Sequence, residues 1–265
     1  MADPIRIFVG TEQKTEIARK VLEHSIRRHT SAEVEFVPMI GPEWEYDISG
    51  IPVGTGFSLR RWMIPAYCGF QGRAIYLDAD TQAFADIEGL WRLPDLPRVE
   101  QVKAPVIWAT FQTDKWSPKR PVPQTSVMVI DCRRAEAFSG FRIDLVLDDL
   151  RARPTKDFYG SVMHASWLPA DRIAHVGVEW NSLNTCKPGV TKLLHFTSES
   201  SQPWYKPDHP FAGLWKSELI KALEAGVVTR ADMEEALGNW DKKEDWRSTN
   251  GLHPSYRKFL VSACT

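Results

Sequence analysis

The sequence predicts an α/β fold in which helices flank a sheet. Two observations support this prediction: a strand, helix and strand in succession at the amino terminus, and several short apolar runs further along the chain. Residues 5–9 form an apolar, β-rich run that ends at Gly10, residues 15–29 place apolar side chains on one helical stripe, and residues 34–39 form a second strand. Such a βαβ unit implies a parallel sheet, whose ligands bind at the carboxyl ends of the strands.

The later elements follow from the same two periodicities. Short apolar runs predict further strands at 74–77, 106–109, 126–130, 173–176 and 192–196. Helical spacing predicts a turn at 86–91, helices at 134–151 and 211–224, and a last helix that opens with a capping box of Thr229 and Asp232 and runs through Leu237. Ser58 is placed to cap a helix through 62–67, which Pro65 would shorten or bend. The stretch 111–123 holds three prolines and several charges, which predicts a mobile or substrate-facing loop.

Composition excludes some classes of function. The 33 basic residues nearly cancel the 34 acidic ones, so no overall field attracts nucleic acid, and we expect no nucleic-acid partner. The four cysteines are widely spaced and form no CxxC pair, which argues against a zinc site and favours free thiols in a reducing cytosol. Neither a signal segment nor a run of about eighteen apolar residues occurs, so we expect a soluble, cytoplasmic protein.

The most informative motif is Ala74-Ile-Tyr-Leu-Asp78-Ala-Asp80, in which an apolar strand runs directly into two carboxylates. Strand side chains alternate, so Asp78 and Asp80 share a face if the extended conformation continues through Ala79. Two carboxylates held close repel each other, and a divalent cation with oxygen ligands, Mg²⁺ or Mn²⁺, would relieve the repulsion. A solvated turn is the alternative. The buried strand that precedes the pair favours the metal site.

Two further motifs support this hypothesis. Leu193-Leu-His195-Phe ends a later apolar strand on a histidine, and because imidazole suits manganese better than magnesium, His195 would complete the metal site. A satisfied core histidine is the alternative. Phe57-Ser-Leu-Arg60-Arg61-Trp62 places two guanidinium groups where they suit a diphosphate or a sugar hydroxyl, unless they simply end an exposed helix.

Several segments, in this order, resemble glycosyltransferase family 8 and its bacterial relatives: FSLRRWMIP, FQGRAIYLDAD, DIEGLW, TSVMVIDC, GVEWNSL and LLHFTSESSQPW. The resemblance covers roughly residues 5–205, and its most specific part is the succession of YLDAD and HF…PW. It implies a GT-A fold, a Rossmann-like mixed sheet flanked by helices. Residues 1–210 would form the nucleotide-sugar-binding catalytic domain, and residues 211–265 a helical carboxyl-terminal extension packed on it.

The resemblance also implies a function. The chain would be a metal-dependent hexosyltransferase that uses a nucleotide-sugar donor, with UDP as the family default, and transfers with retention to a sugar, lipid-linked or small-molecule acceptor. Asp78, Asp80 and His195 match the family's ligands of Mn²⁺ (or Mg²⁺) on the donor diphosphate. The positions that would contact the nucleotide sugar are Gly10, Thr11, Glu12, Arg61, Asp78, Ala79, Asp80, Trp204 and Lys206.

The sequence departs from the family pattern at the positions that handle phosphate, acceptor and sugar. Gln202 precedes the Pro-Trp step where the family usually has a phosphate-binding lysine, so Lys206 or a hydroxyl would have to substitute. Gln124-Thr125-Ser126 replaces an asparagine step, and Asp157-Phe158-Tyr159 replaces an Asp-Gln step. Gln124 and Asp157 are the candidates for the catalytic carboxamide or carboxylate near the anomeric carbon. The sugar and the stereochemical outcome stay open.

Two other functions stay open as well. Haloacid-dehalogenase phosphatases also contain a strand ending in DxD, and Asp148-Asp149 resembles their later acidic pair, but Gln82 stands where that motif has a small hydroxyl or valine. A catalytically silent binder of sugar nucleotides or glycans is suggested by the altered acceptor positions and by the tryptophans at 180, 204, 215, 240 and 246. Basic and aromatic residues at 253–260 predict at most weak peripheral membrane contact.

Overall fold

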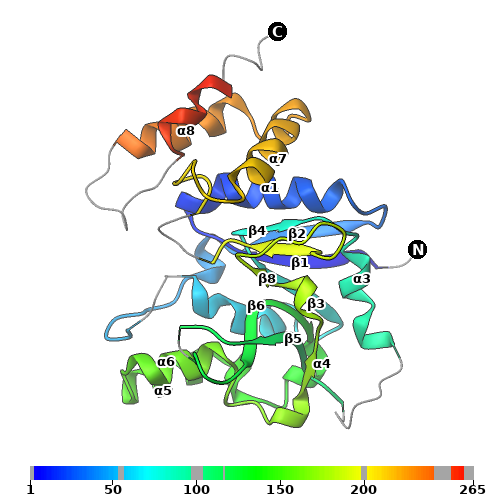
Figure 1. Ribbon diagram of the computed structural model, residues 1–265. Coiled ribbons are helices and arrows are strands. Elements are labelled where there is room, and N and C mark those ends of the chain that lie inside the picture. Colours follow the sequence, from blue (N-terminus) through cyan, green and yellow to red (C-terminus); the bar gives the residue numbers. More distant parts are fainter. Residues whose placement is uncertain are drawn as a thin grey trace. The chain divides into compact units, whose positions relative to one another are not determined.

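The computed structural model describes residues 3–52, 57–96, 104–115, 117–197, 202–241 and 252–259 (Figure 1). The chain forms two compact units, each assembled from separate segments. Unit 1 comprises Met1–Gly10, Ala32–Asp78 and Glu88–Asn181, and unit 2 comprises Thr11–Ser31, Ala79–Ile87 and Ser182–Thr265. The expected boundary at residue 210 stays a prediction.

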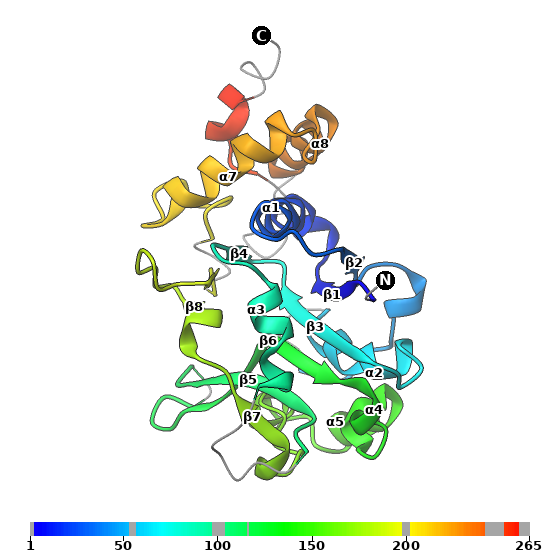
Figure 2. The same ribbon diagram turned by 90° about the vertical axis from the view of Figure 1, so that its right-hand side faces the viewer.

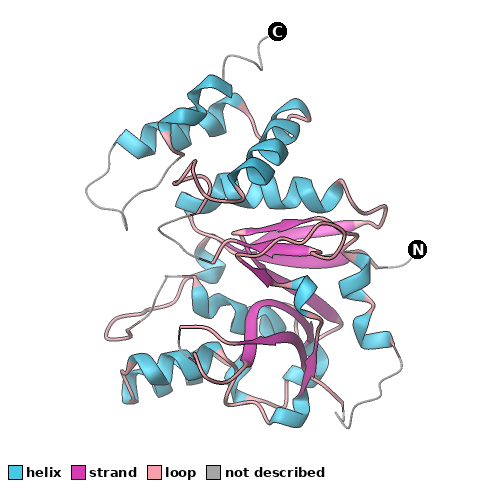
Figure 3. Ribbon diagram, viewed as in Figure 1, coloured by secondary structure: helices cyan, strands magenta, loops and turns pink. Residues whose placement is uncertain are grey.

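A six-stranded sheet is the framework of unit 1 (Figure 3). Its order is β2-β1-β3-β6-β5-β7, with β1 (Ile5–Gly10), β2 (Val34–Pro38), β3 (Arg73–Asp78), β5 (Ile107–Gln112), β6 (Val122–Asp131) and β7 (Ile173–His175). The sheet is mixed: β1 is parallel to β2 and β3, and β5 is parallel to β7, but β6 is antiparallel to β3 and β5. Figure 2 shows β3 and β6 side by side.

This topology confirms the α/β class and the mixed sheet. The parallel pairing implied by the first βαβ unit is present between β1, β2 and β3, whereas β6 is antiparallel to both of its neighbours. The connection from β5 to β6, residues 113–121, is shorter than the roughly twelve residues that a crossover between parallel strands needs. Consecutive residues of β1 from Ile7 to Val9 are all buried, so both faces of this strand are covered, as is usual for a central strand of such a sheet.

Helices pack on one face of this sheet and enclose the core of unit 1. They include the 3-10 turn η3 (Ser58–Met63), α2 (Ile64–Tyr67), α4 (Cys132–Ala135), α5 (Ile143–Ala152) and α6 (Lys156–Met163), and α3 (Glu88–Trp91) belongs to the same unit. Tyr76 and Met128 from the sheet share this core with Trp62 from η3 and Leu150 from α5. The helix expected through 62–67 is therefore a 3-10 turn followed by four α-helical residues, and Pro65 lies in their first turn.

The single helix predicted at 134–151 is wrong, because α4 ends at Ala135 and α5 begins at Ile143. Gly140 lies in the break, and a Cβ atom there would stand 2.2 Å from the ring of Trp167. The chain leaves the helix so that its backbone can approach this ring, and only glycine permits the approach. Helix α6 was not predicted.

Unit 2 combines helices with a small sheet. Its helices are α1 (Glu16–Arg27), α7 (Ala212–Glu224) and α8 (Arg230–Asp241), and its sheet has the order β4-β9-β8, with β4 (Thr81–Ala83), β8 (Ser182–Leu183) and β9 (Leu193–His195). Helix α1 packs on β4 and α7, and Trp204 and Trp215 lie in the shared core. β4 and β8 are too short to be predicted from an apolar run.

The predicted capping box at the start of α8 is present. Asp232 N donates to Thr229 Oγ1 at 3.2 Å, and Thr229 N donates to Asp232 Oδ2 at 2.8 Å. Cys68, Cys132 and Cys186 are free thiols, while Cys264 lies outside the described residues. Within the described part of the chain, no helix has both the length and the apolar character needed to cross a membrane.

Candidate functional site

The first carboxylate of the DxD motif formed by residues 78–80, Asp78, lies inside unit 1. Asp78 is the last residue of β3, beside Gly10 at the end of β1. Arg61 Nη2 donates to Asp78 Oδ1 at 3.1 Å, and the hydroxyl of Tyr76 donates to the same oxygen. Asp78 therefore has charge compensation and two donors from its own unit.

Arg61 is a buried cation whose contacts orient it toward Asp78. Its Nε donates to Ser58 O at 2.8 Å, its Nη1 donates to Thr125 Oγ1 at 3.0 Å, and its guanidinium lies 4.7 Å from the ring centre of Tyr76. Burial lowers the pKa of Arg61, but the charge of Asp78 outweighs this effect and the pKa is raised. Arg61 is 6% exposed, and its contacts in the structure are with Asp78 and the residues around it. The contact expected between Arg61 and the nucleotide-sugar donor stays a prediction.

Gly10 is required by the packing at this edge. A Cβ atom at position 10 would stand 2.2 Å from the Tyr76 hydroxyl oxygen and 3.1 Å from Phe57. No side chain fits there without displacing the ring that donates to Asp78. Gly10 thus supports the Asp78 site sterically, which is a role that the sequence pattern did not indicate.

The second carboxylate lies in unit 2, where it meets the predicted histidine. Residues 79 and 80 form a turn between β3 and β4, so the expectation that the strand stays extended through Ala79 is wrong. β4 pairs with β9, which places Thr81 opposite His195. Asp80 Oδ1 lies 3.1 Å from His195 Nε2, and their side chains are 17% and 6% exposed.

One oxygen of Asp80 has no hydrogen bond although it is buried. Gln202 Nε2 donates to Asp80 Oδ2 at 2.7 Å, and Phe196 N donates to the backbone oxygen of Asp80 at 2.9 Å. Among the described residues none donates to Asp80 Oδ1. A buried carboxylate oxygen without a donor is costly, and it is the arrangement expected where a cation is a partner.

Chain connectivity keeps the two aspartates together. A single residue separates them, so covalent geometry limits the distance between their α-carbons to roughly 7 Å. The carboxylate oxygens of Asp78 and Asp80 and the imidazole nitrogen of His195 form a donor set that could hold a metal ion. Oxygen ligands suit Mg²⁺ and Mn²⁺, and the imidazole favours Mn²⁺.

A polar network that the sequence did not predict lies in unit 1 around Gln124. Its side-chain nitrogen donates to Gln112 O at 3.1 Å and to Asp114 Oδ2 at 3.0 Å. His164 Nε2 lies 2.7 Å from the same Asp114 oxygen. Asp114 and His164 are 50 residues apart, and no local motif marks either of them. The one sequence feature that includes Asp114 is the polar loop predicted at 111–123.

The other predicted contacts are placed as follows. Thr11 is buried and its hydroxyl bonds Thr15, while Glu12 precedes the 3-10 turn η1 (Gln13–Thr15) and pairs with Lys14. Ala79 is buried, and Lys206 is exposed. Their ligand contacts stay predictions.

Two predicted residues have surroundings that do not point to a ligand. The indole of Trp204 is fully buried in the core of unit 2, where it packs against Phe196 and Trp215. Asp157 is exposed in the first turn of α6, which Thr155 caps by accepting from Phe158 N. The structure therefore gives Gln124, which is 9% exposed and hydrogen-bonded, a more ordered setting than Asp157.

The features behind the two alternative functions have structural explanations. Asp148 and Asp149 are exposed on α5, where they pair with Arg151 and Arg153 in the same helical segment. The tryptophans at 180, 204 and 215 are buried, whereas the Trp240 side chain and Trp246 lie outside the described residues. In the segment suggested for membrane contact, Tyr256 is buried and donates to Pro203 O at 2.7 Å, and Leu260 lies outside the described residues.

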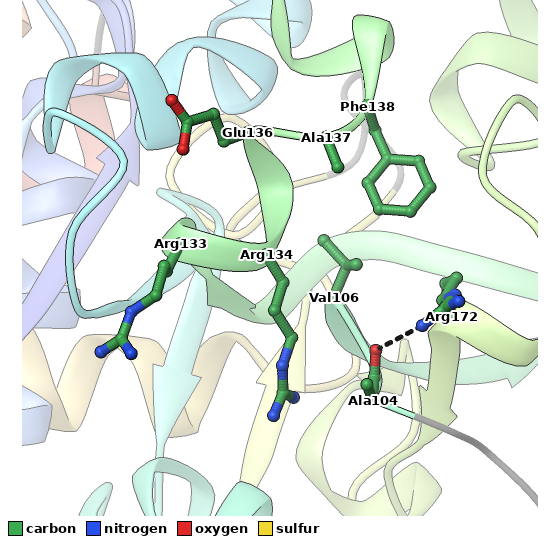
Figure 4. Close-up of a pocket in the computed structure, with 8 residues that line it drawn as sticks. All are labelled: Ala104, Val106, Arg133, Arg134, Glu136, Ala137, Phe138 and Arg172. Atoms are coloured by element: carbon green, nitrogen blue, oxygen red, sulfur yellow. Dashed lines mark hydrogen bonds between the residues drawn. The ribbon is translucent and has the colours of Figure 1, made fainter.

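A hollow of about 440 Å³ lies elsewhere on unit 1 (Figure 4). Its lining comprises Ala104, Val106, Arg133, Arg134, Glu136, Ala137, Phe138 and Arg172. It adjoins the carboxyl end of β6, where Asp131 pairs with Arg73 at the start of β3. Asp78 is at the other end of β3, so this hollow contains none of the predicted site residues.

Comparison with known proteins adds the fold family. No family model matches the chain. Protein CDI of Arabidopsis thaliana is 25% identical to this chain, over 82% of this chain and 86% of that protein.

Solved structures are similar in fold. The galactosyltransferase LgtC, solved in complex with donor and acceptor sugar analogs, matches with a TM-score of 0.59 and 11% identity over 81% of this chain and 95% of LgtC. The glycosyltransferase GlyE of Streptococcus pneumoniae TIGR4 matches with a TM-score of 0.55 and 13% identity over 85% of this chain. The match spans 64% of the GlyE chain. The protein therefore has the GT-A fold of these glycosyltransferases.

Proposed function

We propose that this protein is a glycosyltransferase that transfers a hexose from a nucleotide-sugar donor, with a divalent cation bound by Asp80, His195 and Asp78. The observation that carries the proposal is the buried Asp80 Oδ1, which has no hydrogen-bond donor among the described residues and lies 3.1 Å from His195 Nε2. The GT-A fold supports it, because the matched structures of this fold are glycosyltransferases.

The donor set fits a divalent cation. Asp80 and His195 offer an oxygen and a nitrogen in unit 2, and Asp78, two residues earlier in the chain, offers one further carboxylate oxygen. We infer Mn²⁺ as the preferred ion, because the imidazole is a better ligand for it than for Mg²⁺. When bound, the cation supplies positive charge that stabilises a nucleoside diphosphate as leaving group.

The protein's own residues prepare this site in three ways. Arg61 and Tyr76 orient the Asp78 carboxylate by hydrogen bonds, and the buried guanidinium offsets its charge. Gln202 orients Asp80 by bonding its other oxygen, so that Oδ1 is left available. UDP as the nucleotide and retention of configuration are the finer parts of the proposal, and they rest on the sequence resemblance alone.

The test is a screen of nucleotide sugars with thermal stability and nucleoside diphosphate release as readouts, in Mn²⁺, in Mg²⁺ and in EDTA. We expect UDP with Mn²⁺ to raise the melting temperature of the wild-type protein and one UDP-hexose to be consumed. Asp80→Ala should remove both effects without unfolding the protein. Asp148→Ala, which replaces an exposed aspartate on α5, is the matched control and should behave as wild type.

Three outcomes would contradict the proposal. Equal stabilisation of wild type and Asp80→Ala by UDP with Mn²⁺ would show that Asp80 does not bind the cation. Stabilisation without consumption of any nucleotide sugar would favour a silent binding protein. Release of phosphate from an aryl phosphate, with no nucleoside diphosphate released from any nucleotide sugar, would favour a phosphatase.

A further inference from the structure

The strand β6 carries an irregularity at the position where its sequence turns polar. In its pairing with β5, Ala109 lies opposite Met128, but the next residue, Thr110, lies opposite Gln124. The residues between Gln124 and Met128 thus have no partner on β5, which is a bulge. Bulges of this kind re-aim side chains and are common beside active sites.

Each polar side chain at the bulge has a specific partner. Thr125 Oγ1 accepts from Arg61 and donates to Met163 O, and Ser126 Oγ accepts from Asn181 Nδ2 at 3.1 Å. The bulge is therefore connected through Arg61 to Asp78 within unit 1. It lies at the same end of β3 as Asp78, since Leu77 pairs with Val127.

The carboxamide of Gln124 has its nitrogen fully occupied and its oxygen available. The amide nitrogen carries two hydrogens, and it donates to Gln112 O and to Asp114 Oδ2. These two bonds determine which end of the carboxamide is the oxygen. No described residue bonds Gln124 Oε1, although Gln124 is only 9% exposed.

Asp114 is anchored strongly enough to hold this orientation. It accepts from Gln124 Nε2 at 3.0 Å, from Ser117 N at 2.9 Å and from His164 Nε2 at 2.7 Å. Burial raises the pKa of Asp114, but the hydrogen bonds outweigh it and the pKa is lowered. A carboxylate only accepts hydrogen bonds, so His164 carries a proton on Nε2 and donates it. His164 is itself buried at the end of α6, which Thr125 holds through Met163 O.

We propose that Asp114 and His164 are positioning residues that orient the Gln124 carboxamide, so that its Oε1 accepts a hydrogen bond from a hydroxyl group of the sugar substrate. This inference rests on the proposed glycosyltransferase function and adds to it the residues that hold the sugar. The carboxamide oxygen is oriented before the substrate binds, so it can accept a hydrogen bond from a hydroxyl group without rearranging. Because this oxygen is neutral, it adds no second negative charge beside Asp114, as a carboxylate would.

The kinetic test replaces His164 in two ways. His164→Leu removes the donor to Asp114, whereas His164→Gln keeps an N–H group that can reach it. With the UDP-hexose that the wild-type protein consumes, we expect His164→Leu to lower kcat/KM for hydrolysis roughly tenfold and His164→Gln to stay within about threefold of wild type. Stabilisation by UDP with Mn²⁺, which lacks the hexose of the donor, should be unchanged in both. His29→Leu is the control, because this histidine belongs to unit 2 and its ring bonds Ser25 O at 2.7 Å at the end of its own helix.

A second measurement does not depend on a substrate. Hydrogen exchange of the Gln124 side-chain amide, followed by NMR and assigned by its loss in Gln124→Ala, should be slow in wild type and in His164→Gln. In His164→Leu it should be faster by roughly tenfold, because the Asp114 acceptor is no longer anchored.

The outcomes separate the inference from the proposed function. Equal kcat/KM and equal amide exchange in wild type and His164→Leu would overturn the inference while leaving glycosyl transfer intact. Equal losses in His164→Leu and His164→Gln, with lowered melting temperatures, would show a merely structural role and also overturn it. A wild-type protein that consumes no nucleotide sugar would overturn the proposed function and the sugar contact together, and the amide exchange would still decide the orientation.

Discussion

Arg61 and Asp78 form a largely buried ion pair at the end of β3. Arg61 Nη2 lies 3.1 Å from Asp78 Oδ1, and the two side chains are 7% and 15% exposed. The pair explains how the first carboxylate of the DxD motif is tolerated in the interior of unit 1. The second carboxylate, Asp80, differs from the first, because its buried Oδ1 has no hydrogen-bond donor among the described residues.

Loss of Arg61 should therefore destabilise the protein. Arg61→Met leaves the Asp78 charge buried without its cation, and we expect the free energy of unfolding to fall by about 3 kcal/mol in urea denaturation. The double variant Arg61→Met with Asp78→Asn removes the uncompensated charge and should recover part of the loss. An unchanged unfolding midpoint in Arg61→Met would show that the pair does not stabilise the fold.

His195 should determine the metal preference. The wild-type protein should bind Mn²⁺ more tightly than Mg²⁺ in the presence of UDP, and His195→Asp should shift the preference toward Mg²⁺, because a carboxylate suits the harder ion. Titration calorimetry with each ion measures the shift, which we expect to be roughly tenfold in the ratio of the two Kd values. An identical ratio in wild type and variant would exclude His195 as a ligand.

Acid should weaken unit 2 through Glu218. This residue of α7 is 2% exposed, and it accepts from Arg28 Nη2 at 3.0 Å and bonds His24 Nδ1 of α1 at 2.7 Å. Burial raises the pKa of Glu218, but these hydrogen bonds outweigh it and hold the pKa below its ordinary value of 4.5. A lowered folded-state pKa means that the stabilisation is complete above pH 4.5 and is lost as the pH falls through the folded-state value.

The measurement compares Glu218→Gln with wild type at several pH values. At pH 7 we expect the variant to lose about 2 kcal/mol of unfolding free energy. The difference between the two proteins should shrink as the pH falls from 4.5 through the lowered folded-state pKa of Glu218, because only below that pKa are both side chains neutral in the folded protein. A difference that stays constant from pH 7 to pH 3 would show that the Glu218 charge makes no contribution.

Gly140 should tolerate no side chain. A Cβ atom there would stand 2.2 Å from Trp167, so Gly140→Ala must displace the indole, and we expect a loss of about 1–3 kcal/mol. Gly213 in α7 is the matched control, because a Cβ atom there meets nothing within 4 Å. Gly213→Ala should be neutral or stabilise by up to about 1 kcal/mol. Equal melting temperatures for the two variants would contradict the steric argument.

Local patterns predicted the elements whose side chains repeat regularly. The apolar runs at β1, β3 and β9 and the helical stripes of α1 and α7 each determine an element by themselves, so the α/β class and the positions of Asp78 and His195 at strand ends followed from the sequence. The break at Gly140 did not follow, because the residues around it continue a helical pattern and the close approach of the distant Trp167 to Gly140 is visible only in the folded chain.

The sequence by itself thus determined the class of fold, the capping box at Thr229, and the carboxylates and imidazole that can bind a metal. The tertiary structure decided that Arg61 pairs with Asp78, that β6 bulges at Gln124, and that His164 meets Asp114 although they are 50 positions apart in the sequence. The physical reason is the separation in the sequence over which each interaction acts. Strand and helix periodicities arise between neighbours in the chain, whereas hydrogen bonds between distant residues exist only after the sheet has paired and the core has closed.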